Sequence, residues 1–462
     1  MSLGFDAKKV VDRILSRKDY IVEEVRKLLR MPSISGTGEG IEDVAGYLRD
    51  WIRDRLGANT TLLRYGGHPI VYGKLDSGKE KTIIFYNMYD VQPTGPLELW
   101  SSPPFEARIV EDKIIARGAT NTKGALMSTL LGFEAMVEVL GESPVNIIFA
   151  LEGEEELGSP SMPKFVEDKK VELQDADTGL FTIPSEVELG KPRIQLGNKG
   201  IVFIELKCRT SKYEVHGSYS RGFYNPAVIL SKIVSELIDP HFGPRIPWLE
   251  EKTVLPTPED LMLLDQLIEC TPLEKMMESH GIKSSRLRGR EWYQAVFFKP
   301  NVNVDGFTAG YTGPGTKTVL PNEATLRIDF RIVPNIEPED VIEGLKSLIE
   351  RLGLSDMVEV NVLDGYSWSK ISPRAPVVEV AKEAYSDMGV NPYIIPLITG
   401  SAPMYLFTRV LKIPVIVTGP GHGERAHAPN EFITVDTTWK TASYVVYLTN
   451  RLISCKKDLR VL

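Results

Sequence analysis

The chain has few cysteines, no long apolar run and no excess of basic charge. Its three cysteines, Cys208, Cys270 and Cys455, are widely spaced and odd in number. This usage is typical of a reducing compartment and argues against a cysteine-based metal site. No run reaches about 18 apolar residues, so we expect no membrane span. The first residues, 1–6, lack the basic and then apolar pattern of a secretion signal, and we expect a cytoplasmic protein.

The charge balance is acidic, with a formal net charge of −8. A partner such as nucleic acid requires a basic face, so we expect no nucleic-acid binding. Hydrophobic residues make up 42% of the chain and charged residues 25%, which is ordinary for a globular protein. The 462 residues are enough for two or three domains.

The first part of the chain alternates between strand-like and helix-like segments. Residues 82–86 and 145–151 are compact apolar runs, as expected of buried strands, and 125–140 is a mostly apolar helix between them. This alternation predicts an α/β fold with a sheet covered by helices on both faces.

The pattern changes near Gly200 and returns after the proline-containing linker 371–376. Between them, strands and helices alternate in a way that predicts a sheet with helices on one side. The strand-like segments are 202–209, 302–309, 324–333 and 357–363, and the helix-like segments are 226–238 and 338–352. We therefore expect an α+β domain at 200–365, inserted into an α/β domain made of 1–199 plus 366–462.

Acidic residues follow both of the buried strands in the first part. Asp90 comes after 82–86, and Glu152, Glu154, Glu155 and Glu156 come at the end of 145–151. Functional groups of open α/β sheets lie on loops at the carboxyl ends of strands. Several carboxylates held close together need a cation or a basic neighbour to stay ionised. The acidic group therefore marks a candidate site.

Five ordered motifs carry a resemblance that covers almost the whole chain. They are Tyr-Asp-Val-Gln-Pro with Leu-Trp-Ser-Ser-Pro-Pro-Phe within 85–105, Arg117-Gly-Ala with Lys123-Gly, Glu152-Gly-Glu-Glu-Glu-Leu-Gly-Ser, Gly310 to Pro321, and Ala426-His-Ala-Pro-Asn-Glu. The chain resembles metallopeptidase family twenty: carnosinase-like dipeptidases, glutamate carboxypeptidases, aminoacylases, acetylornithine deacetylases and succinyl-diaminopimelate desuccinylases. The resemblance implies a zinc-peptidase-like α/β domain with an inserted lid and dimerisation domain.

The resemblance also assigns roles at the site, position by position. It implies that Glu155 is the general base, that Glu156 and His427 are metal ligands, and that Asp90 orients the first histidine ligand. Three of the five ligand positions are substituted, however: they read Met88, Asn121 and Ile183. An offset of one or two would place the third at Pro184 or Ser185, and the nearest carboxylate is Glu186.

These substitutions remove the charge that holds two zinc ions. A Met thioether is a soft ligand that suits zinc poorly, Asn is neutral and Ile has no donor atom. We therefore expect no zinc or one zinc. Met88 and Ile183 would fill the vacated space, and Lys123 would neutralise Glu156. Alternatively, His422 and Glu424 would join His427 in a relocated single-metal site.

Some of the substrate-binding residues that the resemblance implies are present, and others are replaced. His216 matches a histidine of the inserted domain that stabilises the oxyanion, often across a dimer interface, so we expect a homodimer. The resemblance also implies substrate contacts from Asn225, Arg331, Gly400 and Ser401. The family's Arg-x-Gly-Gly-Ser motif reads Leu397-Ile-Thr-Gly-Ser401 here, and Leu cannot replace a carboxylate-binding Arg.

Two hypotheses follow. In the first, the chain is a catalytically degenerate member of the family that acts in binding or regulation. In the second, it is an active peptidase or deacylase of dipeptides or N-acyl amino acids, with one rearranged metal and Glu155 as general base. A third possibility is a small-molecule binder that holds a small peptide or an amino-acid-like ligand in the cleft between the domains.

Overall fold

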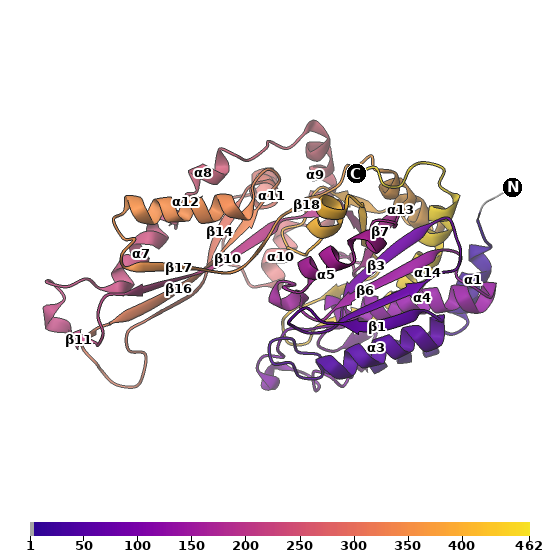
Figure 1. Cartoon of the computed structure of the whole chain (residues 1–462), viewed down its shortest axis with the longest axis horizontal. Coiled ribbons are helices and arrows are strands. Elements are labelled where there is room, and N and C mark those ends of the chain that lie inside the picture. Colours follow the sequence, from indigo (N-terminus) through magenta and orange to yellow (C-terminus); the bar gives the residue numbers. More distant parts are fainter. Residues whose placement is uncertain (1–3) are drawn as a thin grey trace.

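The computed structural model describes residues 4–462, so the first three residues of the 1–6 start lie outside it. It has a larger lobe, which contains both termini of the described chain, and a smaller lobe that extends from it (Figure 1). Each lobe is built around its own sheet.

The larger lobe contains a mixed eight-stranded sheet. Its order is β1-β2-β6-β3-β7-β20-β8-β19. The strands are β1 (Asn59–Leu63), β2 (Ile70–Leu75), β3 (Thr82–Met88), β6 (Asn146–Glu152), β7 (Thr178–Thr182), β8 (Arg193–Gln195), β19 (Tyr393–Ile395) and β20 (Val415–Thr418). The central strand β3 runs parallel to β6 and β7, whereas β2 runs antiparallel to β6.

Helices cover both faces of this sheet, because side chains alternate along each central strand. In β3, Ile83 and Phe85 belong to one buried cluster, and Ile84 and Tyr86 belong to the cluster on the other face. The first face is covered by α1 (Ala7–Leu15), α2 (Lys18–Leu29), α3 (Ile41–Leu56), α4 (Gly124–Leu140), α13 (Pro376–Asp387) and α14 (Val435–Ser454). The second is covered by α5 (Met162–Asp168) and the segment 402–413. The predicted α/β fold is confirmed.

The smaller lobe contains an antiparallel four-stranded sheet in the order β14-β16-β10-β17. The strands are β10 (Gly200–Arg209), β14 (Asn301–Ala309), β16 (Glu323–Ile332) and β17 (Val358–Tyr366). Helices α7 (Pro226–Leu237) and α12 (Pro338–Arg351) cover one face, which buries every second residue of β10, such as Val202. The alternate residues Ile201 and Phe203 therefore lie on the other face.

The chain crosses between the lobes twice, and the two crossings are hydrogen-bonded to each other. The outward crossing contains β9 (Gly197–Asn198) and the return crossing contains β18 (Ser369–Lys370). Helices α9 (Pro258–Cys270), α10 (Leu273–Ser279) and α11 (Gly289–Phe298) form a separate cluster that includes Ile395 of β19. This part of the inserted segment thus packs on the edge of the larger sheet.

A third sheet lies beside the site, in the order β21-β22-β5-β4. Its strands are β4 (Arg108–Val110), β5 (Lys113–Ile115), β21 (Gly423–Glu424) and β22 (Phe432–Thr434). It holds the segment that carries His427 between β21 and β22. Within residues 4–462, no helix is long and apolar enough to cross a membrane.

Candidate functional site

The acidic residues lie at the carboxyl ends of β3 and β6. These strands are parallel neighbours, and Met88, the last residue of β3, is paired with Glu152, the last residue of β6. Asp90 follows β3 by two residues, and a short 3-10 turn, Glu155–Leu157, follows β6. The two loops therefore meet at one edge of the sheet, as the sequence predicts.

Asp90 holds the glutamate turn in place. Its buried carboxylate accepts the backbone N–H groups of Glu155 and Glu156 at 3.2 and 3.0 Å. Burial, reinforced by the negative charge of Glu156, raises the pKa of Asp90 to about 7. Because position 88 is Met, Asp90 has no histidine to orient there, and it positions the two glutamates instead.

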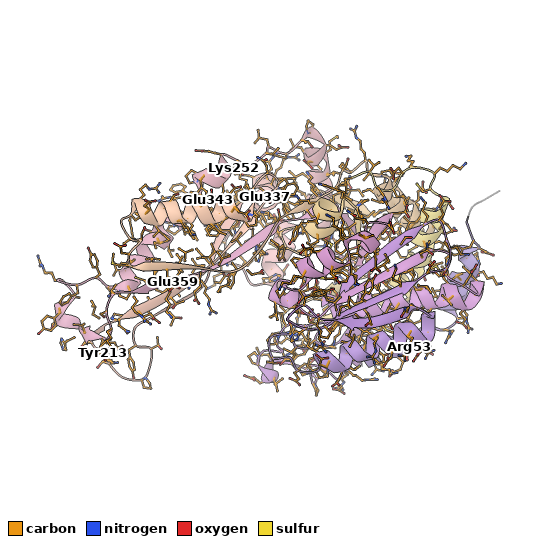
Figure 2. The ribbon with its side chains drawn as sticks, viewed as in Figure 1. Arg53, Tyr213, Lys252, Glu337, Glu343 and Glu359 are labelled. Atoms are coloured by element: carbon orange, nitrogen blue, oxygen red, sulfur yellow. The ribbon has the colours of Figure 1, made fainter. Side chains whose placement is uncertain are left out.

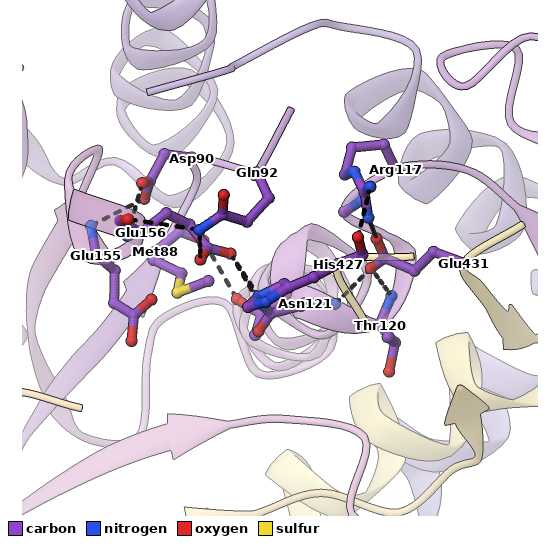
Figure 3. A network of polar contacts seen from close by, with 12 residues as sticks. Met88, Asp90, Gln92, Arg117, Thr120, Asn121, Glu155, Glu156, His427 and Glu431 are labelled. Carbon is purple, nitrogen blue, oxygen red and sulfur yellow. Dashed lines mark hydrogen bonds and ion pairs between the residues drawn. The ribbon is translucent and has the colours of Figure 1, made fainter. Parts of the chain in front are cut away.

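Amide groups surround the Glu156 carboxylate (Figure 3). Its Oε2 accepts from Gln92 Nε2 at 2.8 Å, and its Oε1 accepts from Asn121 Nδ2 at 2.7 Å. His427 Nε2 lies 3.1 Å from the same Oε1 and 2.8 Å from Asn121 Nδ2. The hydrogen bond to Glu156 raises the pKa of His427. The Glu156 side chain, only 5% exposed, is thus held by two amides and an imidazole.

Lys123 does not neutralise Glu156, so that prediction is wrong. The buried ammonium donates to the backbone oxygen of Met31 at 2.7 Å. Burial lowers the pKa of Lys123 to about 7, opposed by the charges of Glu431 and Asp90.

A buried ion pair supports the amide side of the site. Arg117 Nη1 lies 2.7 Å from Glu431 Oε2, and both side chains are 1% exposed. The Glu431 carboxylate also accepts the backbone N–H groups of Gly118, Thr120 and Asn121. Arg117 Nη2 donates to the backbone oxygen of His427 at 3.2 Å. The pair therefore ties the Asn121 turn to the segment that carries His427.

The substituted positions supply no replacement ligands. Met88 is buried, and Ile183 packs against the hydrophobic cluster on the α5 face of the sheet. Neither side chain lines the cleft described below. The alternatives Pro184 and Ser185 also provide no carboxylate, and Ser185 Oγ donates to the backbone oxygen of Gly419 at 2.7 Å.

The other candidate metal ligands, Glu186 and His422, form hydrogen bonds with the backbone. The Glu186 carboxylate accepts the backbone N–H groups of Gly190 and Gly421 at 2.7 and 2.8 Å. His422 Nδ1 lies 2.8 Å from the backbone oxygen of Glu186, and its Nε2 lies 3.5 Å from Glu424. In the described part of the chain, no three His, Cys, Asp or Glu side chains are grouped to hold a metal. His422 and Glu424 therefore form no such group with a third side chain in residues 4–462.

A cleft of about 730 Å³ lies between the lobes, next to this network. From the larger lobe it is lined by Gln92, Asn121, Glu155, Glu156, Leu157, Gly158, Gly400, Ser401, Ala426 and His427, and from the smaller sheet by Ile201, Phe203, Asp305, Asp329, Arg331, Leu363, Asp364 and Tyr366. The fold thus brings Glu155, Glu156, His427, Arg331, Gly400 and Ser401 to one cavity.

Glu155 faces this cleft without a partner for its carboxylate. Among the interactions of residues 4–462, its backbone N–H donates to Asp90 and its backbone oxygen accepts from Gly158, whereas its carboxylate has no hydrogen bond. Burial, followed by the charges of Glu156 and Asp90, raises the pKa of Glu155 well above its ordinary value.

Arg331 faces the same cleft from β16. Its Nε donates to Asp329 Oδ1 at 2.7 Å and its Nη1 to Ser401 Oγ at 2.9 Å. Leu397, at the position of the family's carboxylate-binding Arg, is buried in the hydrophobic cluster of the smaller lobe. Arg331 is therefore the guanidinium that this cleft offers to a ligand.

His216 and Asn225 do not reach the cleft. His216 belongs to β11 (Val215–His216), which pairs with β15 (Val319–Leu320) at the far end of the smaller lobe, where its side chain is exposed (Figure 1). Asn225 caps α7 by accepting the backbone N–H of Ala227 at 2.9 Å. Any contact of His216 with a cleft would require a second copy of the chain.

Sequence reasoning missed several residues of the site. Gln92, Arg117 and Glu431 lie in motifs that carried the resemblance, but their interactions appear only in the structure. Asp305, Asp329 and Asp364 have no local sequence signal, because strand pairing in the smaller sheet brings them to the cleft.

Comparisons with known proteins identify the family of the chain and agree with its fold. Residues 84–451 match the family described as Peptidase family M20/M25/M40. The crystal structure of an M20 family metallo-carboxypeptidase, Sso-CP2 from Sulfolobus solfataricus, has a TM-score of 0.88 and 32% identity over 94% of this chain and 99% of that one. The Cys-Gly metallodipeptidase dug1 of Schizosaccharomyces pombe is 26% identical over 95% of this chain and 96% of its own length. The structure of human carnosine dipeptidase 1 shares the fold, with a TM-score of 0.82 and 20% identity over 97% of this chain and 100% of that one. The chain therefore belongs to the M20 peptidase family.

Proposed function

We propose that this M20 member binds a small peptide or an amino-acid-like ligand in the cleft and acts in binding or regulation, without two-zinc hydrolysis. The observation that carries the proposal is the environment of Glu156. Where the family resemblance implies two dications, this carboxylate is held by Gln92, Asn121 and His427. One carboxylate and one imidazole cannot balance the charge of two zinc ions.

The cleft offers complementary groups for a zwitterionic ligand. Arg331 Nη2 makes no hydrogen bond within residues 4–462 and is available to a ligand carboxylate. Glu155, across the cleft, has an unpartnered carboxylate that suits a ligand amine. A ligand with both groups, such as an amino acid or a dipeptide, matches this arrangement.

A second candidate function is supported by Glu155 itself. Its free carboxylate lies in the same cleft as Glu156 and His427, where a general base would be needed. Under this alternative the chain is a peptidase or deacylase with one rearranged metal.

Metal content separates the two candidates. The protein is incubated with excess zinc, desalted and analysed by mass spectrometry, together with the double variant Met88→His/Asn121→Asp as a matched control. We expect near-zero zinc in the wild type and measurable zinc in the variant, which regains two ligand types. About one zinc per wild-type chain, with dipeptide hydrolysis abolished by Glu155→Gln, would favour the mononuclear enzyme.

Ligand binding is tested by calorimetry with a panel of dipeptides in zinc-free buffer. We expect binding to weaken by about 10- to 100-fold in Arg331→Met, the range for a lost charged hydrogen bond. Arg327→Met is the matched control, because Arg327 lies on the same strand, pairs with Glu205 and does not line the cleft. Absence of binding to every peptide would contradict the proposed function.

We further propose a homodimer through the smaller lobe. Exposed aromatic side chains lie close to His216 in the sequence: Tyr213, Tyr219, Phe223 and Tyr224 are each more than half exposed. Figure 2 shows Tyr213 at the end of the smaller lobe, far from the larger one. A patch formed by such exposed aromatic side chains would suit an interface between copies.

A further inference from the structure

Carboxyl groups outnumber cationic groups in the lining of the cleft. Its lining contains two groups that can be cationic, Arg331 and His427. The carboxylates that line it are Glu155, Glu156, Asp305, Asp329 and Asp364. Arg331 is paired with Asp329, and His427 with Glu156. For the other three, no Lys, Arg or His nitrogen of the described residues forms an ion pair.

Of these three carboxylates, Asp364 has a neighbouring backbone amide as its partner. It lies on β17 opposite Phe203 of β10, and among the described residues its carboxylate accepts only the backbone N–H of Gly365, at 2.7 Å. Asp305 accepts from Asn303 Nδ2 at 2.9 Å, and burial, followed by the charge of Asp329, raises its pKa to about 6. Burial raises the pKa of Asp364 to about 6, so the carboxylate remains mostly ionised at pH 7 without a counter-charge.

Asp364 also stands at the junction of two cavities. A pocket of about 200 Å³ adjoins the main cleft, and Gly158, Asp364 and Tyr366 line both. The remaining walls of the smaller pocket are largely apolar: Pro160, Pro163, Pro403, Tyr405 and Leu406. The rings of Tyr366 and Tyr405 are stacked, with centroids 6.0 Å apart and planes 7° apart.

A carboxylate beside aromatic walls is chemically complementary to a long basic side chain. Long basic side chains join an apolar stem to a charged end, and the stem packs along apolar and aromatic surfaces. A pocket with aromatic walls and an unpaired carboxylate at its mouth suits such a side chain better than an acidic or a short polar one. The excess of carboxyl groups in the lining also disfavours ligands with anionic side chains, because like charges repel.

We propose that the cleft selects ligands with a basic side chain, and that Asp364 pairs with the positive end of that side chain while Tyr366 contacts its stem. This inference rests on the proposed function, since it names the class of peptide or amino acid that the same cleft binds. Asp364 is then the residue that determines specificity, and Arg331 and Glu155 contact the backbone ends of the ligand.

The test compares three dipeptides by calorimetry in zinc-free buffer: glycyl-lysine, glycyl-norleucine and glycyl-glutamate. Norleucine keeps the apolar stem of lysine and lacks the amine. We expect wild-type protein to bind glycyl-lysine about 10-fold more tightly than glycyl-norleucine, as one charged hydrogen bond contributes. Glycyl-glutamate should bind most weakly of the three.

The variant Asp364→Asn should remove the preference for glycyl-lysine and leave the affinity for glycyl-norleucine within about 2-fold. Asp356→Asn, an exposed position in the same lobe and outside the cleft, is the matched control and should keep the preference. The wild-type comparison needs no variant, so the proposal is tested even if Asp364→Asn fails to fold.

The outcomes separate this inference from the proposed function. Binding of the three peptides with equal affinity, or an unchanged preference in Asp364→Asn, would overturn the basic-ligand inference and leave the proposed function standing. If none of these peptides or of the wider panel binds, the proposed function fails and the inference fails with it.

Discussion

At the scale of single residues, the amide of Asn121 stands where the family resemblance implies a bridging aspartate. Its Nδ2 donates to Glu156 Oε1 at 2.7 Å, so a neutral donor satisfies the carboxylate that a cation would otherwise hold. An aspartate at the same position would bring a second negative charge against Glu156.

Asn121→Asp should therefore destabilise the metal-free protein and make its stability depend on zinc. We expect the free energy of unfolding, measured by urea denaturation in a chelator, to fall by about 1–3 kcal/mol, the cost of losing a partly buried hydrogen bond to a carboxylate. Added zinc should restore it, because the variant regains a third ligand. Asn121→Ala is the control: it should lose stability without a response to zinc. A zinc-insensitive Asn121→Asp variant would contradict this account.

The pair Arg117–Glu431 is a second residue-scale determinant, since both side chains are 1% exposed. Arg117→Leu leaves the Glu431 charge buried and should lower the free energy of unfolding by about 3–5 kcal/mol in chemical denaturation. Arg451→Leu removes an ion pair with Asp387 in which the arginine is 37% exposed, and it should cost about 0–1 kcal/mol. Equal effects of the two variants would show that the buried pair does not organise the site.

At the scale of elements, the glycine turn after β6 allows the two lobes to approach. Gly158 adopts a φ of +86°, and a Cβ added there would clash with the Asp364 carboxylate of the smaller lobe. Gly141, the cap of α4, has a nearly identical φ of +85° but nothing within 4 Å of an added Cβ. Substitution of either glycine therefore costs the same backbone strain, but only a side chain at position 158 would also clash with Asp364.

Both substitutions to alanine should destabilise the protein, but by different amounts. Gly141→Ala should cost about 1 kcal/mol from the left-handed backbone alone. Gly158→Ala should cost about 1–3 kcal/mol more, because Asp364 must move. This additional destabilisation should be smaller in the double variant Gly158→Ala/Asp364→Ala, which lacks the clashing carboxylate. The melting temperatures of all three variants measure the difference. Equal melting temperatures for the two single variants would rule out the interlobe contact.

The strands also show which features of the structure could be predicted from the sequence. The apolar run 82–86 predicted a buried strand, and β3 extends it only to Met88, because local hydrophobicity determines such a strand. Glu155 and Glu156 were placed correctly at the sheet edge by the same logic. Asp364 could not be found, since it reaches the cleft through pairing of β17 with the distant β10. Likewise, the bond of Lys123 to Met31 depends on tertiary packing, which no local pattern reports.

At the scale of the whole molecule, a buried lysine lies where the chain passes between the lobes. Lys199 follows β9 and donates to the backbone oxygen of Lys299 at 2.6 Å. Burial, with the nearby charge of Arg331, lowers its pKa to about 7. The folded protein therefore releases this proton near pH 7, whereas the unfolded chain keeps it until about pH 10.4.

Because the unfolded state binds more protons between these two values, the Lys199 contribution makes stability rise with pH from about 7 to 10.4. Its slope is at most about 1.4 kcal/mol per pH unit. Lys199→Met should remove this slope, as measured by urea midpoints at pH 7, 8 and 9. Lys412→Met, at an exposed lysine of the larger lobe, is the control and should leave the slope unchanged. An unchanged slope in Lys199→Met would mean that the folded protein keeps the lysine charged.

The smaller lobe gives the final prediction, because His216 is exposed near its end and does not line the cleft of its own chain. His216 and the exposed aromatic residues around it would remain in water in a monomer. We expect sedimentation velocity to give the mass of a dimer at micromolar concentration. Tyr213→Ser/Tyr224→Ser should shift the protein toward the monomer, since both rings lie in the patch. Leu255→Ser is the matched control: Leu255 is 82% exposed and lies between α8 (Pro247–Glu250) and α9, two helices that Figure 1 shows away from β11. A wild-type monomer at every concentration would exclude the dimer, and with it any role of His216 in a partner's cleft.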